Sequence, residues 1–167
     1  MHIRAASPSD NDTIRTLTYT AFKGHPHHAP GTEPREHLII DHLRVAGALT
    51  LSLVAEEDGE ILGHLALSPV KLNGANCSWH GLGPVSVMPG HQSKGIGSEL
   101  IREGLRQMKS LGSMGVVVLG EPDYYARFGF RHDETLEYPG VPAHYFMVQA
   151  FKSGHSKGEV TFHPAFC

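Results

Sequence analysis

The sequence is poor in the features that mark disulfide-rich, membrane-spanning and nucleic-acid-binding proteins. It has only two cysteines in 167 residues, one predicted in a loop (Cys77) and one at the final position (Cys167), so we expect no disulfide framework. No apolar run approaches the roughly 20 residues that cross a bilayer, and the first residues lack a signal-peptide pattern, which predicts a cytoplasmic protein. A formal net charge of -3 gives no electrostatic reason to expect a nucleic acid or an anionic membrane as partner.

Histidine, by contrast, is abundant, with 13 residues in the chain. The group His25, His27 and His28 is the densest cluster and could in principle bind a metal ion. Neighbouring histidines in a proline-bounded segment do not supply the preorganised ligand face of a helical His-x-x-x-His pair. We therefore expect a flexible loop at this position and no metal cofactor.

The first half of the chain predicts antiparallel strands preceded by two helices. Ser7, Pro8 and Asp10 combine an N-cap, a first-turn proline and an acidic third position, which is typical of a helix start. The dipeptide Asp58-Gly59 is a strong signal for a tight hairpin, and Asn73-Gly74 predicts another turn. The expected elements are a strand at 3–6, a helix from Ser7, a helix at 35–45, and strands at 49–55, 61–67 and 81–88, the last closed by Pro89.

The second half contains the clearest helix and a parallel crossover. Apolar residues recur at three- and four-residue intervals over 96–111, and Gly112 is a natural stop. The expected inner face consists of Leu100, Ile101, Leu105, Met108 and Leu111. The branched apolar run 116–119 then predicts a strand covered on both faces, and further strands are expected at 145–151 and 160–162. The fold class is therefore α/β, a single domain over 1–167 with a mixed sheet, antiparallel at first and parallel in the middle, and with helices on both faces.

The segment from Gln92 to Gly97 carries the strongest chemical signal. It connects a predicted strand to the helix that begins near Ile96, and the first turn of a helix offers unpaired amides and a partial positive charge. Gly95 and Gly97 would let the backbone approach a diphosphate, Lys94 could add a charge, and the Ser98 hydroxyl could donate a hydrogen bond.

Two better-known phosphate loops do not fit this segment. In a Walker loop the lysine follows the last glycine, whereas here Lys94 precedes Gly95. A dinucleotide fingerprint needs a third glycine three residues after Gly97, where this chain has Leu100. Neither ATP nor NAD is supported.

The chain resembles the GNAT superfamily of acetyl-CoA-dependent N-acetyltransferases in two motifs and in the order of its elements. The strand VSVMP followed by HQSKGIG is similar to the family's Gln/Arg-x-x-Gly-x-Gly/Ala pyrophosphate loop. The segment YYARFGF is similar to the family's ending in which a tyrosine lies four residues before a Gly-Phe pair, a place that Tyr125 takes before Gly129.

This resemblance implies that the strands 81–88 and 116–119 splay apart around the cofactor acetyl-CoA. It further implies direct attack on the thioester by an amine of a small molecule or peptide, with Tyr125 giving a proton to the departing thiolate. A phenol of pKa about 10 and a thiol of pKa about 8.5 are close enough for such a transfer. The cofactor-binding residues that it implies are Val85, Val87, Gln92, Ser93, Lys94, Gly95, Ile96, Gly97 and Ser98.

The chain also departs from the family pattern. Many members carry a glutamate five residues before the closing proline of the fourth strand, and this position is Pro84 here. Glu121, Asp123 or His80 could receive the proton of the amine through water, although each is better explained as a solvated or loop residue. An acyl-CoA-binding sensor or interaction module without significant turnover is the alternative. The acceptor-binding segments expected at 25–36 and 137–144 name no substrate, and the sequence leaves the oligomeric state open, a homodimer included.

Overall fold

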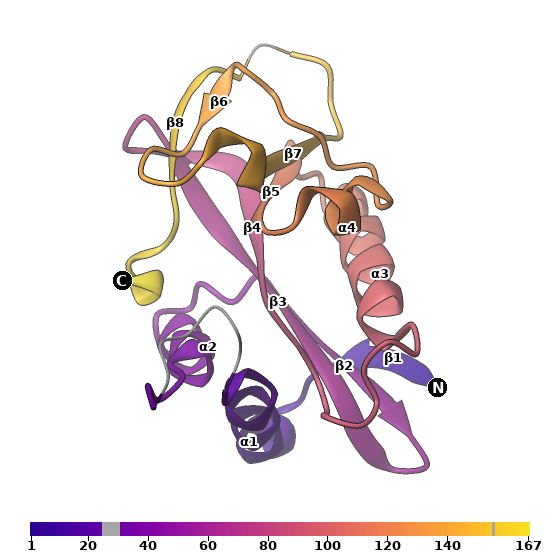
Figure 1. Cartoon of the computed structure of the whole chain (residues 1–167). Helices are drawn as coiled ribbons and strands as arrows, with labels where there is room; N and C mark the ends of the chain where they lie inside the picture. Colours follow the sequence, from indigo (N-terminus) through magenta and orange to yellow (C-terminus); the bar gives the residue numbers. More distant parts are fainter. Residues whose placement is uncertain (25–30, 155) are drawn as a thin grey trace.

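Helices lie on both faces of one mixed β-sheet in the computed structural model, which describes residues 1–24, 31–154 and 156–167 (Figure 1). The strands are β1 (His2–Ala5), β2 (Leu51–Glu57), β3 (Glu60–Leu72), β4 (Ala75–Val87), β5 (Gly115–Leu119), β6 (Leu136–Glu137), β7 (Phe146–Ala150) and β8 (Gly158–Thr161). The helices are α1 (Asn11–Phe22), α2 (Glu36–Val45), α3 (Ile96–Ser110) and α4 (Pro122–Ala126), with the short 3-10 turns η1 (Pro8–Asp10), η2 (Ala143–Tyr145) and η3 (Pro164–Phe166). The predicted loop with His25, His27 and His28 lies outside the described residues.

The antiparallel part of the sheet is built on two tight turns, as the sequence predicts. Asp58 and Gly59 adopt φ values of 52° and 79°, and Asn73 and Gly74 adopt 53° and 76°. Positive φ at both central residues matches the right-handed twist of the flanking strands. Because the second turn is so short, β4 begins directly after it, and Cys77 lies on this strand. The prediction that Cys77 lies in a loop was therefore wrong.

Helix α3 matches the predicted range closely and ends at Gly112. The Ser113 amide donates to the Met108 carbonyl at 3.1 Å and the Gly112 amide to the Lys109 carbonyl at 3.2 Å, which is a Schellman motif. Its inner face packs closely on β3, since a Cβ at Gly104 would lie 2.5 Å from Leu65 Cδ2. The placement of Leu111 on this face was wrong. Its side chain is 65% exposed, because the chain turns away from the sheet at the end of the helix.

The central strands β4 and β5 pair in parallel over a short stretch and then separate. The pairing runs from Trp79 opposite Gly115 to Gly81 opposite Val117, beyond which β4 pairs with β3 alone. A β-bulge lies at this point, because Leu65 and Leu67 on β3 face Val85 and Leu82 on β4. The extra residue bends β4 away from its partner, so the predicted splay is present.

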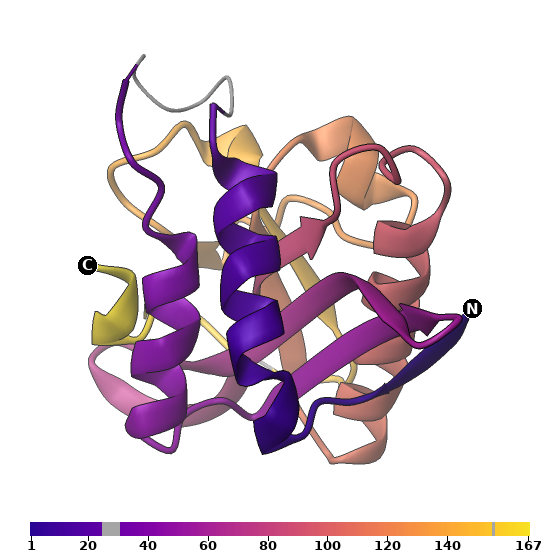
Figure 2. The ribbon, with the colours of Figure 1, turned by 90° about the horizontal axis from the view of Figure 1, so that it is seen from below.

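The two faces of the sheet carry different helices. Helices α1 and α2 lie side by side across one face, and α3 lies behind the other (Figure 2). Buried side chains between α1, α2 and the sheet form one core, with Ile14, Leu17, Ile40 and Val54. The face toward α3 carries a larger core. No helix in the described part of the chain is long and apolar enough to cross a membrane.

Candidate functional site

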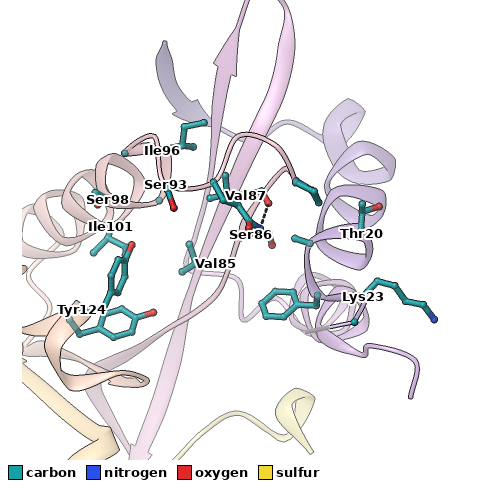
Figure 3. A pocket seen from close by; sticks show the side chains of 18 of the residues that line it. Thr20, Lys23, Val85, Ser86, Val87, Ser93, Ile96, Ser98, Ile101 and Tyr124 are labelled. Atoms are coloured by element: carbon teal, nitrogen blue, oxygen red, sulfur yellow. Dashed lines mark hydrogen bonds between the residues drawn. The ribbon is translucent and has the colours of Figure 1, made fainter. Parts of the chain in front are cut away.

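A cleft of about 990 Å³ opens where β4 leaves β5. Thr20 of α1 and Lys23, which follows this helix, lie on one side of it (Figure 3). Tyr124 and the start of α3 lie on the other side, and the last residues of β4 lie between them. The lining residues are Thr20, Ala21, Phe22, Lys23, Gly24, Val85, Ser86, Val87, Pro89, Gln92, Ser93, Gly95, Ile96, Gly97, Ser98, Ile101, Tyr124, Tyr125 and Arg127.

The end of β4 offers backbone hydrogen-bonding groups to this cleft. Ser86 lies opposite His64, and the amide of Met88, directly after β4, donates to the Leu62 carbonyl at 2.8 Å, so both residues bond toward β3. By the alternation of an antiparallel ladder, Val85 and Val87 turn their backbone groups the other way, toward the cleft. The Val87 carbonyl accepts a hydrogen bond from Gln92 Nε2 at 3.3 Å (Figure 3, dashed line). The remaining groups are available to an extended ligand.

The start of α3 adds a group of unpaired amides. Gly95 is the N-cap with φ 86°, and no side chain caps the helix. The Glu99 amide makes the first helical bond, 3.0 Å to the Gly95 carbonyl, so the amides of the preceding turn have no partner within the helix. Together with the helix dipole they favour an anion at this position.

Two tyrosines of α4 complete the wall beside α3. A Cβ at Gly120 would lie 2.3 Å from Tyr125 Cε2, so the aromatic ring occupies the space that this glycine leaves. Burial, followed by the charge of Tyr124, raises the pKa of Tyr125 to about 12, and its hydroxyl therefore keeps its proton at neutral pH. The Tyr124 hydroxyl lies 3.3 Å from the position that a Cβ at Gly97 would take. Both rings line the cleft, and the Tyr124 ring also packs edge-on against Tyr125 and Phe128.

A sequence model of the acetyltransferase (GNAT) domain matches residues 2–132 of this chain. The chain belongs to the GNAT acetyltransferase family. The N-acetyltransferase YhbS of Escherichia coli K12 is 34% identical over 146 residues, which cover 84% of this chain and 82% of YhbS. YjhQ of the same strain, another N-acetyltransferase, is 33% identical over 116 residues, or 68% of this chain and 63% of YjhQ.

Solved GNAT structures share the fold over almost the whole chain. A GNAT family acetyltransferase from Brucella melitensis, crystallised with acetyl-CoA, is 46% identical, with a TM-score of 0.86 over 99% of this chain and 97% of its own. The structure of Escherichia coli YhbS with CoA is 30% identical, with a TM-score of 0.88 over 99% of this chain and 91% of its own. The expected fold class and the family resemblance are thereby confirmed.

The GNAT fold brings most of the predicted site residues together. Tyr125 lines the cleft, as do all the predicted cofactor-binding residues except Lys94. Lys94 is exposed on the loop and contributes nothing to the lining. The predicted role of Lys94 beside the diphosphate therefore stays a prediction.

None of the three alternative proton acceptors lies in the cleft. His80 Nδ1 is 2.9 Å from Ser113 Oγ, and burial lowers the pKa of the His80 imidazole. Glu121 and Asp123 are exposed. Pro84 is buried in the bulge of β4, and no carboxylate or imidazole occurs among the described residues that line the cleft. Residues 1–24, 31–154 and 156–167 also contain no group of three potential metal ligands.

The sequence did not predict that the end of α1 and Ser86 line the cleft. Ser86 Oγ donates to Thr18 Oγ1 at 3.1 Å, and both side chains are buried, so this bond fixes α1 against β4. Arg127 was missed as well, although it stands two residues after Tyr125 in the recognised motif. That proximity was the available signal for Arg127, whereas no local pattern indicates that α1 meets β4.

Proposed function

We propose that the protein transfers an acetyl group from acetyl-CoA to an amine by direct attack on the thioester. One observation carries this proposal: a single cleft joins the unpaired amides of α3, the open backbone edge of β4 and the Tyr125 hydroxyl. The relative from Brucella melitensis, 46% identical, was crystallised with acetyl-CoA. These features match the three parts of the cofactor, which are an anionic diphosphate, an extended amide-bearing arm and a reactive thioester.

In this proposal the cofactor is held mainly by the backbone. The amides between Ser93 and Ser98 bind the diphosphate, where the glycines remove side chains that would block close approach. Val85 and Val87 bond to the amides of the pantetheine arm much as a neighbouring strand would. The end of α1, with Thr20 and Phe22, faces this arm across the cleft and forms the acceptor side.

Two protons move during the reaction. The amine nitrogen bonds to the acetyl carbon, the carbon–sulfur bond breaks, and the sulfur receives a proton while the nitrogen loses one. Tyr125, a buried and protonated phenol, supplies the proton that the sulfur receives. Because its pKa of about 12 exceeds that of a thiol, about 8.5, this transfer is uphill, and it is completed when water returns a proton to the phenolate of Tyr125.

Water receives the proton of the amine in this proposal, because no described lining residue is a carboxylate or an imidazole. This does not prevent turnover. Holding two reactants in attack geometry supplies about 7–11 kcal/mol, whereas a positioned base contributes about 10²–10⁴-fold, or some 3–5 kcal/mol.

The test combines calorimetry with an acceptor screen. We expect saturable binding of acetyl-CoA and release of free thiol with at least one member of a panel of small amines and peptides. Failure to bind acetyl-CoA or CoA would refute the proposal. Binding without thiol release above the background rate, across the whole panel, would instead support a sensor that has lost turnover, a reading that Pro84 favours.

A further inference from the structure

Two arginines from different elements approach the same aromatic ring beside the cleft. Arg127, which follows α4, has its Cζ atom 6.0 Å from the centre of the Phe128 ring and 4.4 Å from that of Tyr124. Arg102 of α3 has its Cζ atom 5.1 Å from the centre of the Phe128 ring. Phe128 itself is buried, so each guanidinium lies near a ring that is fixed in the protein.

Neither guanidinium is neutralised by a carboxylate in the described part of the chain. The carboxylate next to Arg102, that of Glu103, is taken by Arg106 at 2.6 Å and by Gln107 at 2.9 Å. Arg127 donates through Nε to the Tyr124 carbonyl at 3.2 Å and makes no ion pair with a described residue. Its terminal nitrogens keep their N–H donors, in the fork geometry that binds phosphate oxygens.

The position of Arg127 connects this pair to the cofactor. Among the described lining residues the cleft has two cations, Lys23 and Arg127. The Lys23 ammonium is bound by Glu33 at 2.5 Å, so Arg127 is the cation that remains available. Both guanidinium groups lie within 6.0 Å of the centre of the Phe128 ring, so an anion bound beside this ring would be attracted by both.

We propose that Arg102 and Arg127 together bind the phosphomonoester on the ribose of CoA. The inference rests on the proposed function, since it concerns the same ligand. The diphosphate already has its partners in the amides at the start of α3, whereas the ribose phosphate is a separate dianionic group that needs its own. Arg127 lines the cleft, and Arg102 of α3 lies near the same ring outside this lining, so the two residues supply charge and several donors at once.

The experiment compares CoA with 3′-dephospho-CoA by calorimetry at one ionic strength. Arg127→Gln and Arg102→Gln should each weaken CoA binding about tenfold and change the binding of 3′-dephospho-CoA by less than about twofold. Lys109→Gln, which removes an exposed cation from the far end of α3, is the matched control and should leave both affinities unchanged. Retained affinity for 3′-dephospho-CoA also shows that each variant is folded.

Three results would overturn this inference while leaving the proposed function intact. Equal weakening of both ligands would place the arginines on the diphosphate. Unchanged CoA affinity in both variants would show that neither arginine contacts the ribose phosphate. If Lys94→Gln weakens the binding of CoA but not of 3′-dephospho-CoA, and Arg127→Gln does not, then Lys94 binds the ribose phosphate. If the unmodified protein binds neither ligand, the proposed function itself is wrong.

Discussion

The two sides of the cleft present different kinds of groups to a ligand. On the cofactor side, the segment from Ser93 to Ser98 presents backbone amides whose geometry depends on glycine at Gly95 and Gly97. On the acceptor side, the end of α1 and Ser86 present side chains, brought together by the bond between Ser86 and Thr18. Backbone recognition requires particular residues at fixed spacing and leaves a motif in the sequence, whereas recognition by side chains from distant elements does not.

The largest effect is expected from a charge placed among the amides of the cofactor side. Gly95→Asp would put a carboxylate where the diphosphate binds, and two such charges about 4 Å apart repel by about 4 kcal/mol near a protein surface, or about 10³-fold in Kd. Calorimetry with acetyl-CoA measures this loss.

Gly90→Asp is the matched control for that charge. Gly90 lies in the same loop with φ 89°, against 86° for Gly95, and a Cβ at either position would meet nothing within 4 Å. Gly90 does not line the cleft. We expect a much smaller loss for Gly90→Asp, and equal losses in the two variants would show that the effect is general repulsion or strain.

The next largest effect should come from the proton donor. Tyr125→Phe keeps the ring that fills the space beside Gly120 but removes the hydroxyl, so we expect kcat to fall about 10²-fold with little change in the Kd of acetyl-CoA. Steady-state thiol release and calorimetry separate the two quantities. An unchanged kcat across the pH range would refute the acid role of Tyr125.

Gly120→Ala tests the same role through position. The added methyl group would lie 2.3 Å from Tyr125 Cε2, so the ring must move. We expect a fall in kcat in this variant as well, and no additional fall when it is combined with Tyr125→Phe. Additive losses would show that Gly120 acts on the site in another way.

The contrast between the two sides also explains which parts of the molecule the sequence could predict. The turns at Asp58-Gly59 and Asn73-Gly74, and helix α3 with the loop before it, depend on local chemistry and were predicted from it. The bulge at Pro84 depends on how β4 pairs with β3 over the whole hairpin, and the contact between Thr18 and Ser86 joins residues 68 positions apart. No local pattern carries that information.

Lys94 shows that a motif predicts a segment better than it predicts the direction of each side chain. In the proposed mode of binding the loop acts through its backbone, so a lysine within it need not face the cleft, and the Lys94 side chain is exposed. Arg127, from the other motif, lines the cleft. The sequence therefore predicted two segments that meet at the cleft, but not which of their charged side chains lines it.

A smaller effect, on the free energy of unfolding, is expected from a buried histidine beneath the acceptor side of the cleft. His64 lies opposite Ser86, is fully buried, and has its Nε2 atom 2.8 Å from Ser52 Oγ while Nδ1 has no partner. Burial, with a smaller contribution from Arg44, lowers the pKa of His64 to about 3, from 6.5 in the unfolded chain. The free energy of unfolding is therefore unaffected by this titration above pH 6.5. It falls as the pH drops toward 3, because the unfolded chain binds a proton that the folded protein does not. At pH 5 this loss amounts to about 2 kcal/mol.

Urea unfolding at pH 8 and pH 5 measures this loss, with His64→Gln as the comparison. The variant should be less stable at pH 8 but should lose about 2 kcal/mol less than the unmodified protein between the two pH values. His80, whose pKa is also lowered by burial, contributes in the same direction in both proteins and cancels in the difference. An identical pH dependence in both would show that His64 does not titrate on unfolding.

The smallest effect should come from the hydroxyl pair that joins the acceptor side to the sheet. Ser86→Ala and Thr18→Val each remove the hydrogen bond of 3.1 Å, and we expect a coupling energy of about 1 kcal/mol in a double-mutant cycle of unfolding. Both variants should leave the Kd of acetyl-CoA unchanged and raise the KM of the acceptor, because only the end of α1 shifts. A change in cofactor affinity equal to that in acceptor KM would show that the two sides of the cleft are not independent, and the contrast between them would fail.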